Sequence, residues 1–363
     1  MRILHVFRKP VGGLFRHVAD LVRGQSALGH EVGLICDSQT GGAAAEAELQ
    51  KLAPHCALGT ARIAISTLPG FGDLAASRLV AQRAKTIGVE IIHGHGAKGG
   101  VYARLAARKL KVPGVYTPHG GSLHYDWLKP PGAAFLAAER VLRFKGTGLI
   151  FVCAFERQLY DKKIGLGPCP SAVVYNGLRA EEFAPRTIAP DATDLLFVGE
   201  MRKLKGVDVL LQALATLPVV KRLTLTLVGE GADQAGFEAL AQTLGLAEHV
   251  RFVGRKTMAE AKMLGRVLVL PSRHESFPYV ILEGIAAQIP VLASNVGGIG
   301  EILPLECLVP ADDSLALAQK LELLVPRAMP NLDVARALQT QAREKFSVAR
   351  MTAGVLAFYN RLR

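Results

Sequence analysis

Two carboxylates eight residues apart, Glu275 and Glu283, are the most informative chemical groups in this sequence. They follow the apolar run 266–271, which is short and β-branched and therefore favours a buried strand. Pro278 suits the first turn of a following helix, because that position does not need the N–H that proline lacks. We therefore expect Glu275 beside the N-terminus of a helix and Glu283 within that helix.

The neighbours of Glu283 are almost all apolar and include Val280, Ile281, Leu282 and Ile285. A helix that is apolar on nearly every face is a buried helix. A carboxylate buried in it is costly unless partners satisfy its oxygens, and a pair of ligand hydroxyl groups would do so. The alternative is that Glu275 complements the helix dipole and that Glu283 lies at a domain cleft.

A basic loop precedes another predicted helix. Arg202, Lys203 and Lys205 follow a strand-like run and come just before a helical pattern that starts near Val207. Cations at a helix N-terminus oppose the helix dipole, so folding alone does not favour them there. A bound diphosphate would reverse the sign of that cost. The alternative is a solvated basic loop without a ligand.

Glycines cluster where predicted strands pass into helices. Glycine lets backbone N–H groups approach phosphate oxygens, and the next helix N-terminus adds a favourable potential. The pattern is not GxGxxG, so the dinucleotide-binding fingerprint is absent. The clusters indicate an anionic ligand, with ordinary turn chemistry as the alternative. The glycines are Gly12 and Gly13, Gly229 and Gly231, and Gly297, Gly298 and Gly300.

Strand-like runs alternate with helical patterns along the whole chain, which predicts βαβ units and parallel sheets. A polar segment at 177–194, which contains Pro185 and Pro190, reads as a linker. We predict an α/β fold of two doubly wound, Rossmann-like domains that face a cleft. Residues 1–180, joined by a C-terminal amphipathic helix at 346–363, form the first domain, and residues 190–345 form the second. The expected strands are 2–6, 31–36, 90–93, 114–118, 148–152, 172–174, 195–198, 223–228, 250–253, 267–270 and 291–293.

Composition narrows the class of protein. Of the 363 residues, 50% are hydrophobic and 20% are charged, which is typical of a globular chain. The first apolar stretch is too short for a signal peptide, and no run approaches the roughly 20 apolar residues of a membrane span. The five cysteines are scattered, which indicates small buried or surface residues in a reducing compartment.

The net charge of +12 is concentrated in the first half of the chain. Residues 1–185 hold 23 Lys and Arg against 13 Asp and Glu, whereas residues 186–363 hold 20 against 18. A nucleic acid, an anionic membrane surface and a phosphorylated substrate would each explain this excess. Nucleic acid is disfavoured, because the basic residues are not interleaved with stacking aromatics.

Taken together, these motifs resemble family 4 of the retaining, nucleotide-sugar-dependent glycosyltransferases, which have the GT-B fold. The likeness runs in order through nearly the whole chain. One departure is Glu200, which stands where the family commonly has an arginine, and Arg202 lies two residues later. The matching segments are Glu275 with Glu283 (the E-x7-E signature), Lys205-Gly206, Val228-Gly-Glu-Gly231, 293–301, Gly12-Gly13 with His17, His93-Gly-His95-Gly, Thr117-Pro-His119-Gly120 and Val174-Tyr-Asn176-Gly177.

The resemblance implies roles for the acids and their neighbours. Glu283 would accept hydrogen bonds from ribose hydroxyls, and Glu275 would contact the transferred sugar. The backbone of Phe277 would lie near that sugar, with His119 close to it across the cleft. These positions imply a donor-binding second domain and an acceptor-binding first domain.

The resemblance also implies how the leaving diphosphate is stabilised. Lys205 and Arg202 would neutralise it, helped by the backbone amides of Gly12, Gly13 and Gly298. Cations and oriented amides act directly on the charge that develops as the anomeric C–O bond breaks. We therefore expect no metal and no cofactor. The sequence holds no convincing Asp-x-Asp site, and the histidines are too scattered to predict a metal centre. Glu200 is expected to turn away from the diphosphate.

The expected function is retaining transfer of a hexose-type sugar from a nucleoside-diphosphate sugar to a glycan or lipid-diphosphate-linked acceptor. Surface polysaccharide or glycolipid biosynthesis is the expected context, in the cytoplasm or peripherally at the inner face of the membrane. The alternatives are a nucleotide-sugar epimerase or a phosphorylase of the same fold, and a catalytically silent nucleotide-sugar-binding protein. A nicotinamide dehydrogenase is disfavoured by the missing fingerprint.

Overall fold

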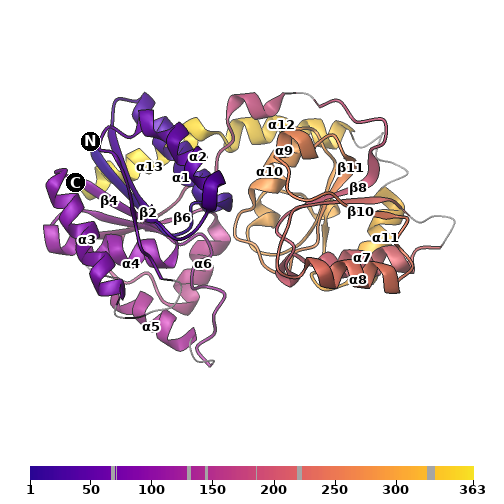
Figure 1. The fold of residues 1–363 in the computed structure, drawn as a ribbon, viewed down its shortest axis with the longest axis horizontal. Coiled ribbons are helices and arrows are strands. Elements are labelled where there is room, and N and C mark those ends of the chain that lie inside the picture. Colours follow the sequence, from indigo (N-terminus) through magenta and orange to yellow (C-terminus); the bar gives the residue numbers. More distant parts are fainter. Residues whose placement is uncertain are drawn as a thin grey trace. The chain divides into compact units, whose positions relative to one another are not determined.

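The computed structural model describes residues 1–66, 70, 72–128, 132–143, 146–184, 186–218, 223–324 and 332–363. Its contacts divide the chain into two compact units, which are drawn in Figure 1. Unit 1 comprises Met1–Gly177 and Val348–Arg363, and unit 2 comprises Leu178–Ser347. Each unit is built around one parallel sheet flanked by helices, as the alternating pattern predicts.

Unit 1 contains a seven-stranded sheet of order β3-β2-β1-β4-β5-β6-β7, in which every pairing is parallel. The strand order reverses between β1 and β4, and in open α/β sheets ligands bind at the carboxyl ends of the strands at such a switch point. The strands are β1 Arg2–Phe7, β2 Glu31–Asp37, β3 Thr60–Ile63, β4 Ile91–His95, β5 Gly114–Thr117, β6 Thr147–Phe151 and β7 Ser171–Val173.

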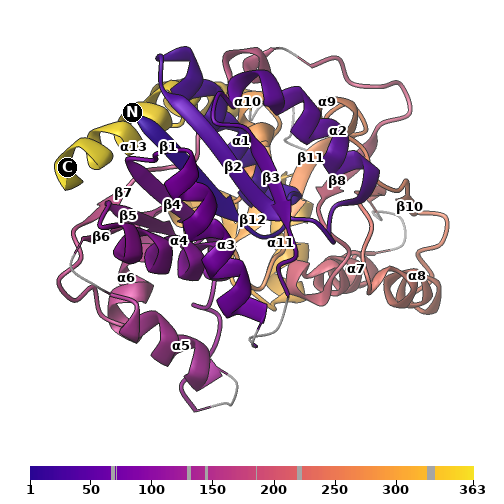
Figure 2. The same ribbon diagram turned by 60° about the vertical axis from the view of Figure 1, so that its left-hand side comes forward.

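Helices cover both faces of this sheet because its central strands are buried apolar runs. The last helix, α13 (Val348–Leu362), belongs to unit 1, where Met351, Val355 and Phe358 pack against Ile3 and the neighbouring strands. Figure 2 shows α13 in yellow beside β1. The other helices of unit 1 are α1 Gly12–Ala27, α2 Gly42–Leu52, η1 Ala53–His55, α3 Gly72–Thr86, α4 Gly96–Leu110, α5 Gly132–Val141 and α6 Ala154–Lys163.

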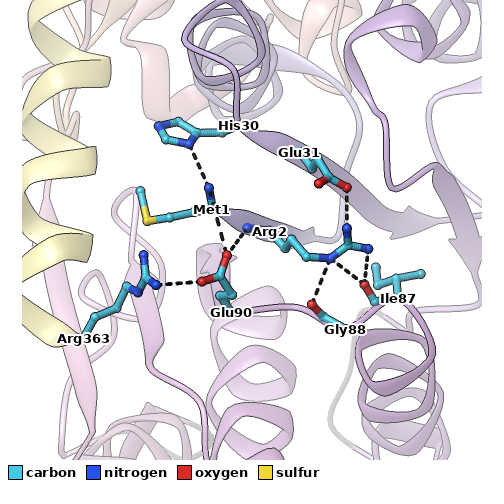
Figure 3. A network of polar contacts seen from close by, with 8 residues as sticks. All are labelled: Met1, Arg2, His30, Glu31, Ile87, Gly88, Glu90 and Arg363. Carbon is cyan, nitrogen blue, oxygen red and sulfur yellow. Dashed lines mark hydrogen bonds and ion pairs between the residues drawn. The ribbon is translucent and has the colours of Figure 1, made fainter.

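A polar network ties the first and last residues of the chain to the same edge of unit 1 (Figure 3). Glu90 accepts a hydrogen bond from the backbone N–H of Arg2 at 2.7 Å and another from Arg363 at 2.8 Å. The Met1 ammonium lies 4.0 Å from Glu90 and 3.0 Å from His30 Nδ1. One carboxylate therefore holds the start of β1 and the end of α13 together.

Unit 2 repeats the same topology with six parallel strands in the order β10-β9-β8-β11-β12-β13. Its switch point lies between β8 and β11. The strands are β8 Thr193–Val198, β9 Leu225–Val228, β10 Val250–Phe252, β11 Gly265–Leu270, β12 Val291–Ser294 and β13 Leu308–Val309. The helices are η2 Ala180–Phe183, η3 Lys203–Lys205, α7 Val207–Thr216, α8 Gln234–Thr243, α9 Met258–Ala261, α10 Tyr279–Ala286, η5 Ile299–Glu301, η6 Leu305–Cys307, α11 Ser314–Leu324 and α12 Leu332–Lys345.

The predicted fold class is confirmed, and most of the predicted strands agree with the structure to within two residues. Two short edge strands, β3 and β13, were not predicted. β3 is only half-buried and carries Arg62, and β13 has two residues, so neither forms an apolar run. The segment predicted as a featureless linker contains η2, whose Phe183 ring is buried beneath the guanidinium of Arg343 at 4.6 Å. Pro185 of that segment lies outside the described residues.

All five cysteines are free and buried, which confirms the interpretation of them as small core residues. Among the described residues, no helix is long and apolar enough to cross a membrane.

Candidate functional site

The strongest candidate site in unit 2 lies at its switch point, where the loops after β8 and β11 meet. Lys205 ends the short helix η3 after β8, and Glu275 lies in the loop between β11 and α10. Lys205 Nζ donates a 2.5 Å hydrogen bond to Glu275 Oε1. Ser272 Oγ donates to the same oxygen at 2.8 Å. The fold therefore brings two predicted site residues into direct contact.

This ion pair is shielded from water but remains accessible. The side chain of Glu275 is 9% exposed and that of Lys205 is 23% exposed. An ammonium carries three N–H donors, so Lys205 keeps two beyond the one it gives to Glu275. Both described hydrogen bonds to Glu275 fall on Oε1, which leaves Oε2 for a ligand. The pair can thus offer a cation to an anionic group and an acceptor to a hydroxyl group.

Arg273, which the sequence reading did not single out, holds the Lys205 loop in place. Its guanidinium binds both carboxylate oxygens of Asp208 on α7 at 2.8 and 2.9 Å and also donates to the backbone carbonyl of Lys203. Its backbone N–H donates to the carbonyl of Leu204 at 2.9 Å. Bidentate pairing fixes geometry as well as charge. The only signal in the sequence was its place in the loop that carries Glu275.

Several glycines of unit 2 allow backbone segments to pack closely, which agrees with the turn-chemistry alternative, and phosphate binding by these loops stays a prediction. A Cβ at Gly206 would lie 1.9 Å from the Pro271 carbonyl oxygen, and one at Gly297 would lie 2.0 Å from that of Glu275. A Cβ at Gly229 would lie 1.8 Å from the Gly199 carbonyl oxygen. These glycines are needed where the loops after β8, β9, β11 and β12 touch, so turn and packing chemistry accounts for them.

The structure describes the surroundings of three other predicted residues of unit 2. The N–H of Gly298 donates to the Ser276 carbonyl at 2.7 Å, so a protein acceptor occupies that amide. The ring of Phe277 is buried against Phe346, with centroids 5.4 Å apart. Glu283 lies on α10 and is half-buried, so the expectation of a fully buried carboxylate was wrong. A carboxylate only partly withdrawn from water does not by itself require a ligand to satisfy it.

Arg202 is the most exposed of the predicted cations of the site. Its guanidinium lies 3.8 Å from the Glu200 carboxylate, and the two side chains are 54% and 50% exposed. Glu200 therefore faces Arg202, and its orientation away from a bound diphosphate stays a prediction. Exposed pairs of this kind contribute little to stability.

In unit 1 the switch point carries Gly12 and Gly13 after β1, where α1 begins. Both glycines are exposed, and no side chain caps the helix. Gly12 has a φ of +72°, and an added Cβ there would meet nothing within 4 Å. Open N–H groups at a helix N-terminus can receive an anion. These surroundings suit the predicted role of Gly12 and Gly13 in receiving an anion, which stays a prediction.

The same switch point gathers five histidines from β1, α1, β4 and the end of β5: His5, His17, His93, His95 and His119. These histidines are too scattered in the sequence for a centre to be predicted there, and the fold brings them together. Burial lowers the pKa of His5 and of His17 from 6.5 to about 4 and holds the pKa of His93, His95 and His119 well below 6.5. The rings are therefore neutral at physiological pH.

A cavity of about 480 Å³ opens beside these rings and is lined by His95, His119, Lys98 and Asp73. Lys98 donates to both oxygens of Asp73 at 2.6 and 2.7 Å. Tyr125 lines the cavity with its ring stacked on Phe135 at 4.9 Å.

Two segments, 69–73 and 122–131, contribute side chains to the lining of this cavity. Trp127, in the second of them, donates to the Lys163 carbonyl at 2.8 Å. Pro69, Phe71 and residues 129–131 of these loops lie outside the described residues.

Comparison with known proteins agrees with this arrangement. The model of the Glycosyltransferase Family 4 matches residues 11–182, and that of the Glycosyl transferases group 1 matches residues 179–344. A D-inositol 3-phosphate glycosyltransferase of Streptomyces scabiei is 32% identical over 239 residues, which are 58% of this chain and 53% of the relative. A glycogen synthase of Mycobacterium tuberculosis is 29% identical over 324 residues, which are 80% of this chain and 76% of the relative. The chain thus spans about half the length of the inositol phosphate glycosyltransferase that it matches.

Solved structures share the fold over the whole chain. HepE of Anabaena in complex with UDP has a TM-score of 0.81 at 19% identity, covering 99% of this chain and 100% of that one. Sucrose-phosphate synthase of Thermosynechococcus elongatus has a TM-score of 0.81 at 20% identity, covering 100% of this chain and 99% of that one. With two family models that together run from residue 11 to residue 344, the chain belongs to the GT-B glycosyltransferases and is a transferase.

Proposed function

We propose that this glycosyltransferase takes a hexose-type sugar from a nucleoside-diphosphate sugar bound by unit 2 and transfers it to an acceptor bound by unit 1. The observation that carries the proposal is the Lys205–Glu275 pair at the switch point of unit 2. A cation and a carboxylate held together at the carboxyl ends of parallel strands suit a ligand that is anionic at one end and hydroxylated at the other.

The chemistry assigned to the donor end follows from these groups. Lys205 neutralises the departing diphosphate with the N–H groups that Glu275 does not use. Oε2 of Glu275 accepts hydrogen bonds from hydroxyls of the transferred sugar, and Glu283 accepts them from the ribose. Arg202 is exposed enough to swing from Glu200 to the diphosphate at little cost. The open amides at Gly12 and Gly13 are proposed, for unit 1 by itself, to receive an anionic group.

We propose retention of anomeric configuration without a metal, since the lysine, the arginine and oriented amides already supply the positive charge that the leaving group needs. UDP sugars are the first donors to test, because HepE binds UDP. The alternatives are a nucleotide-sugar epimerase and a silent binding protein. The former would convert the donor without any acceptor.

For the acceptor we propose a glycan or a lipid-diphosphate-linked sugar. The supporting observation is the excess of basic residues in residues 1–185, together with Arg8, Lys9 and Lys98 around the cavity of unit 1. Surface polysaccharide or glycolipid synthesis at the inner face of a membrane would fit that charge. Absence of binding to anionic vesicles at low salt would remove the membrane part of this proposal.

The test is a transfer assay with a panel of UDP, GDP and ADP sugars and lipid-diphosphate acceptors, followed by ¹H NMR of the product. The expected product keeps the anomeric configuration of the donor. An inverted product would overturn the mechanism, and conversion of donor alone would favour the epimerase. Lys205→Ala is expected to abolish turnover, whereas Lys203→Ala, in the same loop, is the matched control.

A further inference from the structure

The buried histidines of unit 1 form a hydrogen-bonded chain whose ends fix the position of each proton. His5 Nε2 lies 2.9 Å from Gln25 Oε1, an acceptor, so Nε2 carries the proton of that ring. His5 Nδ1 is then an acceptor, and it lies 2.9 Å from His95 Nε2. His95 therefore donates from Nε2, which leaves a lone pair on its Nδ1.

A second lone pair points into the same space from α1. His17 Nδ1 lies 2.9 Å from Asn176 Oδ1 and donates to it, so His17 Nε2 is unprotonated. That side chain is fully buried, and Nε2 has no hydrogen-bond partner within the described ranges. The ligand atoms of His17, His95 and His119 all lie within 4.8 Å of one another.

This triad has two lone pairs, on His95 Nδ1 and His17 Nε2, but only one N–H that can reach them. His119 Nε2 lies 3.2 Å from His95 Nδ1 and satisfies it by donating its proton. One N–H cannot also serve His17 Nε2, and an unsatisfied buried acceptor costs about 1–3 kcal/mol. If His119 moves its proton to Nδ1, three nitrogen lone pairs face one another. A bound cation would satisfy all three lone pairs at once.

We propose that His17, His95 and His119 form a binding site for a divalent transition-metal ion, with Zn²⁺ as the reference ion. Imidazole is a preferred ligand of such ions, and three histidines with one open position is an established zinc arrangement. The 3.2 Å between His95 Nδ1 and His119 Nε2 is close to the separation of two ligands that each lie about 2.0–2.1 Å from a tetrahedral ion.

One further feature supports the site. Asn176 Oδ1 accepts the second ring N–H of His17, and His5 Nδ1 accepts that of His95, which is how outer-shell partners orient metal-binding histidines.

The ion has a route to the site. His95 and His119 line the cavity of unit 1, so its open position would face that space. The charged groups around the cavity are Arg8, Lys9, Lys98, Asp73 and Glu139. This surplus of basic side chains favours an anion, such as hydroxide or phosphate, as the fourth ligand.

Metal binding would inhibit transfer and would not support it, because it removes His119 from the role assigned to it beside the donor sugar. This consequence rests on the proposed function, whereas the metal site does not. The pair Lys205 and Glu275 belongs to unit 2 and is not part of the triad.

The test uses the full, untagged chain, stripped with a chelator and titrated with Zn²⁺ by equilibrium dialysis and with Co²⁺ by visible absorption. We expect one ion per chain and a tetrahedral Co²⁺ spectrum. His17→Ala should weaken binding by more than about 100-fold, and Asn176→Ala by about 10–100-fold, as for other outer-shell losses. His124→Ala, in the same cavity but outside the triad, should bind like the wild type.

Equal Zn²⁺ binding by the wild type and His17→Ala, or no stoichiometric binding by the wild type, would overturn the site. Asn176→Ala keeps the test decisive if His17→Ala does not fold. Nucleotide binding by the zinc-free chain is measured in parallel. Zinc binding without nucleotide binding would refute the proposed function alone, and the reverse would refute the metal site alone.

Discussion

Removal of the Lys205 ammonium should destabilise unit 2 by an amount that depends on Glu275. Lys205→Ala leaves a carboxylate that is 9% exposed without its cation. Hydrogen bonds to charged groups are worth about 1.5–3 kcal/mol, and the 23% exposure of Lys205 lowers the expected cost toward the middle of that range. We expect a loss of about 2 kcal/mol, or about 4–8 °C in Tm for a unit of this size.

A double-mutant cycle isolates the pair. Glu275→Gln alone should cost about 1 kcal/mol, because the remaining ammonium reaches water more easily than the carboxylate does. In Lys205→Ala with Glu275→Gln the unpaired charge is gone, so the double variant should be no less stable than Lys205→Ala. The coupling free energy should be about 1–2 kcal/mol. Lys203→Ala, an exposed lysine of the same loop, should stay within about 0.5 kcal/mol of the wild type.

The assay follows from the composition of the chain. Its single tryptophan, Trp127, lies in unit 1, so intrinsic fluorescence reports that unit alone. Unfolding is therefore followed by far-UV circular dichroism, with hydrogen exchange of α7 and α10 to locate the change, and the Trp127 transition is the internal control. If the costs of the two single variants add up to the cost of the double variant within about 0.5 kcal/mol, the two side chains do not act as a pair.

Three further outcomes are expected. Burial raises the pKa of Cys56 and of Cys307 to about 11, so these thiols stay protonated at mildly alkaline pH. They should therefore resist alkylation in the native protein until urea exposes them. Rapid alkylation of the native protein would contradict this. Gly297→Ala should lower Tm strongly, because its Cβ would collide with the Glu275 carbonyl, whereas Gly236→Ala, in α8 with open space around it, should be neutral or stabilising by about 0.5–1 kcal/mol. Transfer activity should survive EDTA, and full loss with rescue by Mg²⁺ would show that the donor site needs a metal.

The fold could be predicted from the sequence because its central strands are buried on both faces. Such strands appear in the sequence as short apolar runs. The helices between them act as crossover connections, which make neighbouring strands parallel. The edge strand β3 escaped prediction because it is only half-buried and carries Arg62, and β13 escaped because it has only two residues. The bounds of α13 were predicted well because its amphipathic period is uninterrupted.

The site was predictable only in part. The basic loop and the first acid of the signature could be identified by residue type and position, and the fold joins Lys205 to Glu275. The glycines could not be assigned, because close backbone packing and phosphate binding both require a missing Cβ. The histidine cluster was missed because its members meet only through the pairing of β1 with β4 and of β4 with β5.

The most direct test of the donor site is calorimetric titration of UDP, GDP and ADP into the metal-free chain, repeated with Lys205→Ala and with the control Lys203→Ala. The predicted result is binding of one of these nucleotides in EDTA, lost in Lys205→Ala and kept in Lys203→Ala. Binding that is unchanged in Lys205→Ala, or no binding of any nucleoside diphosphate, would contradict the assignment of the donor site to the switch point of unit 2.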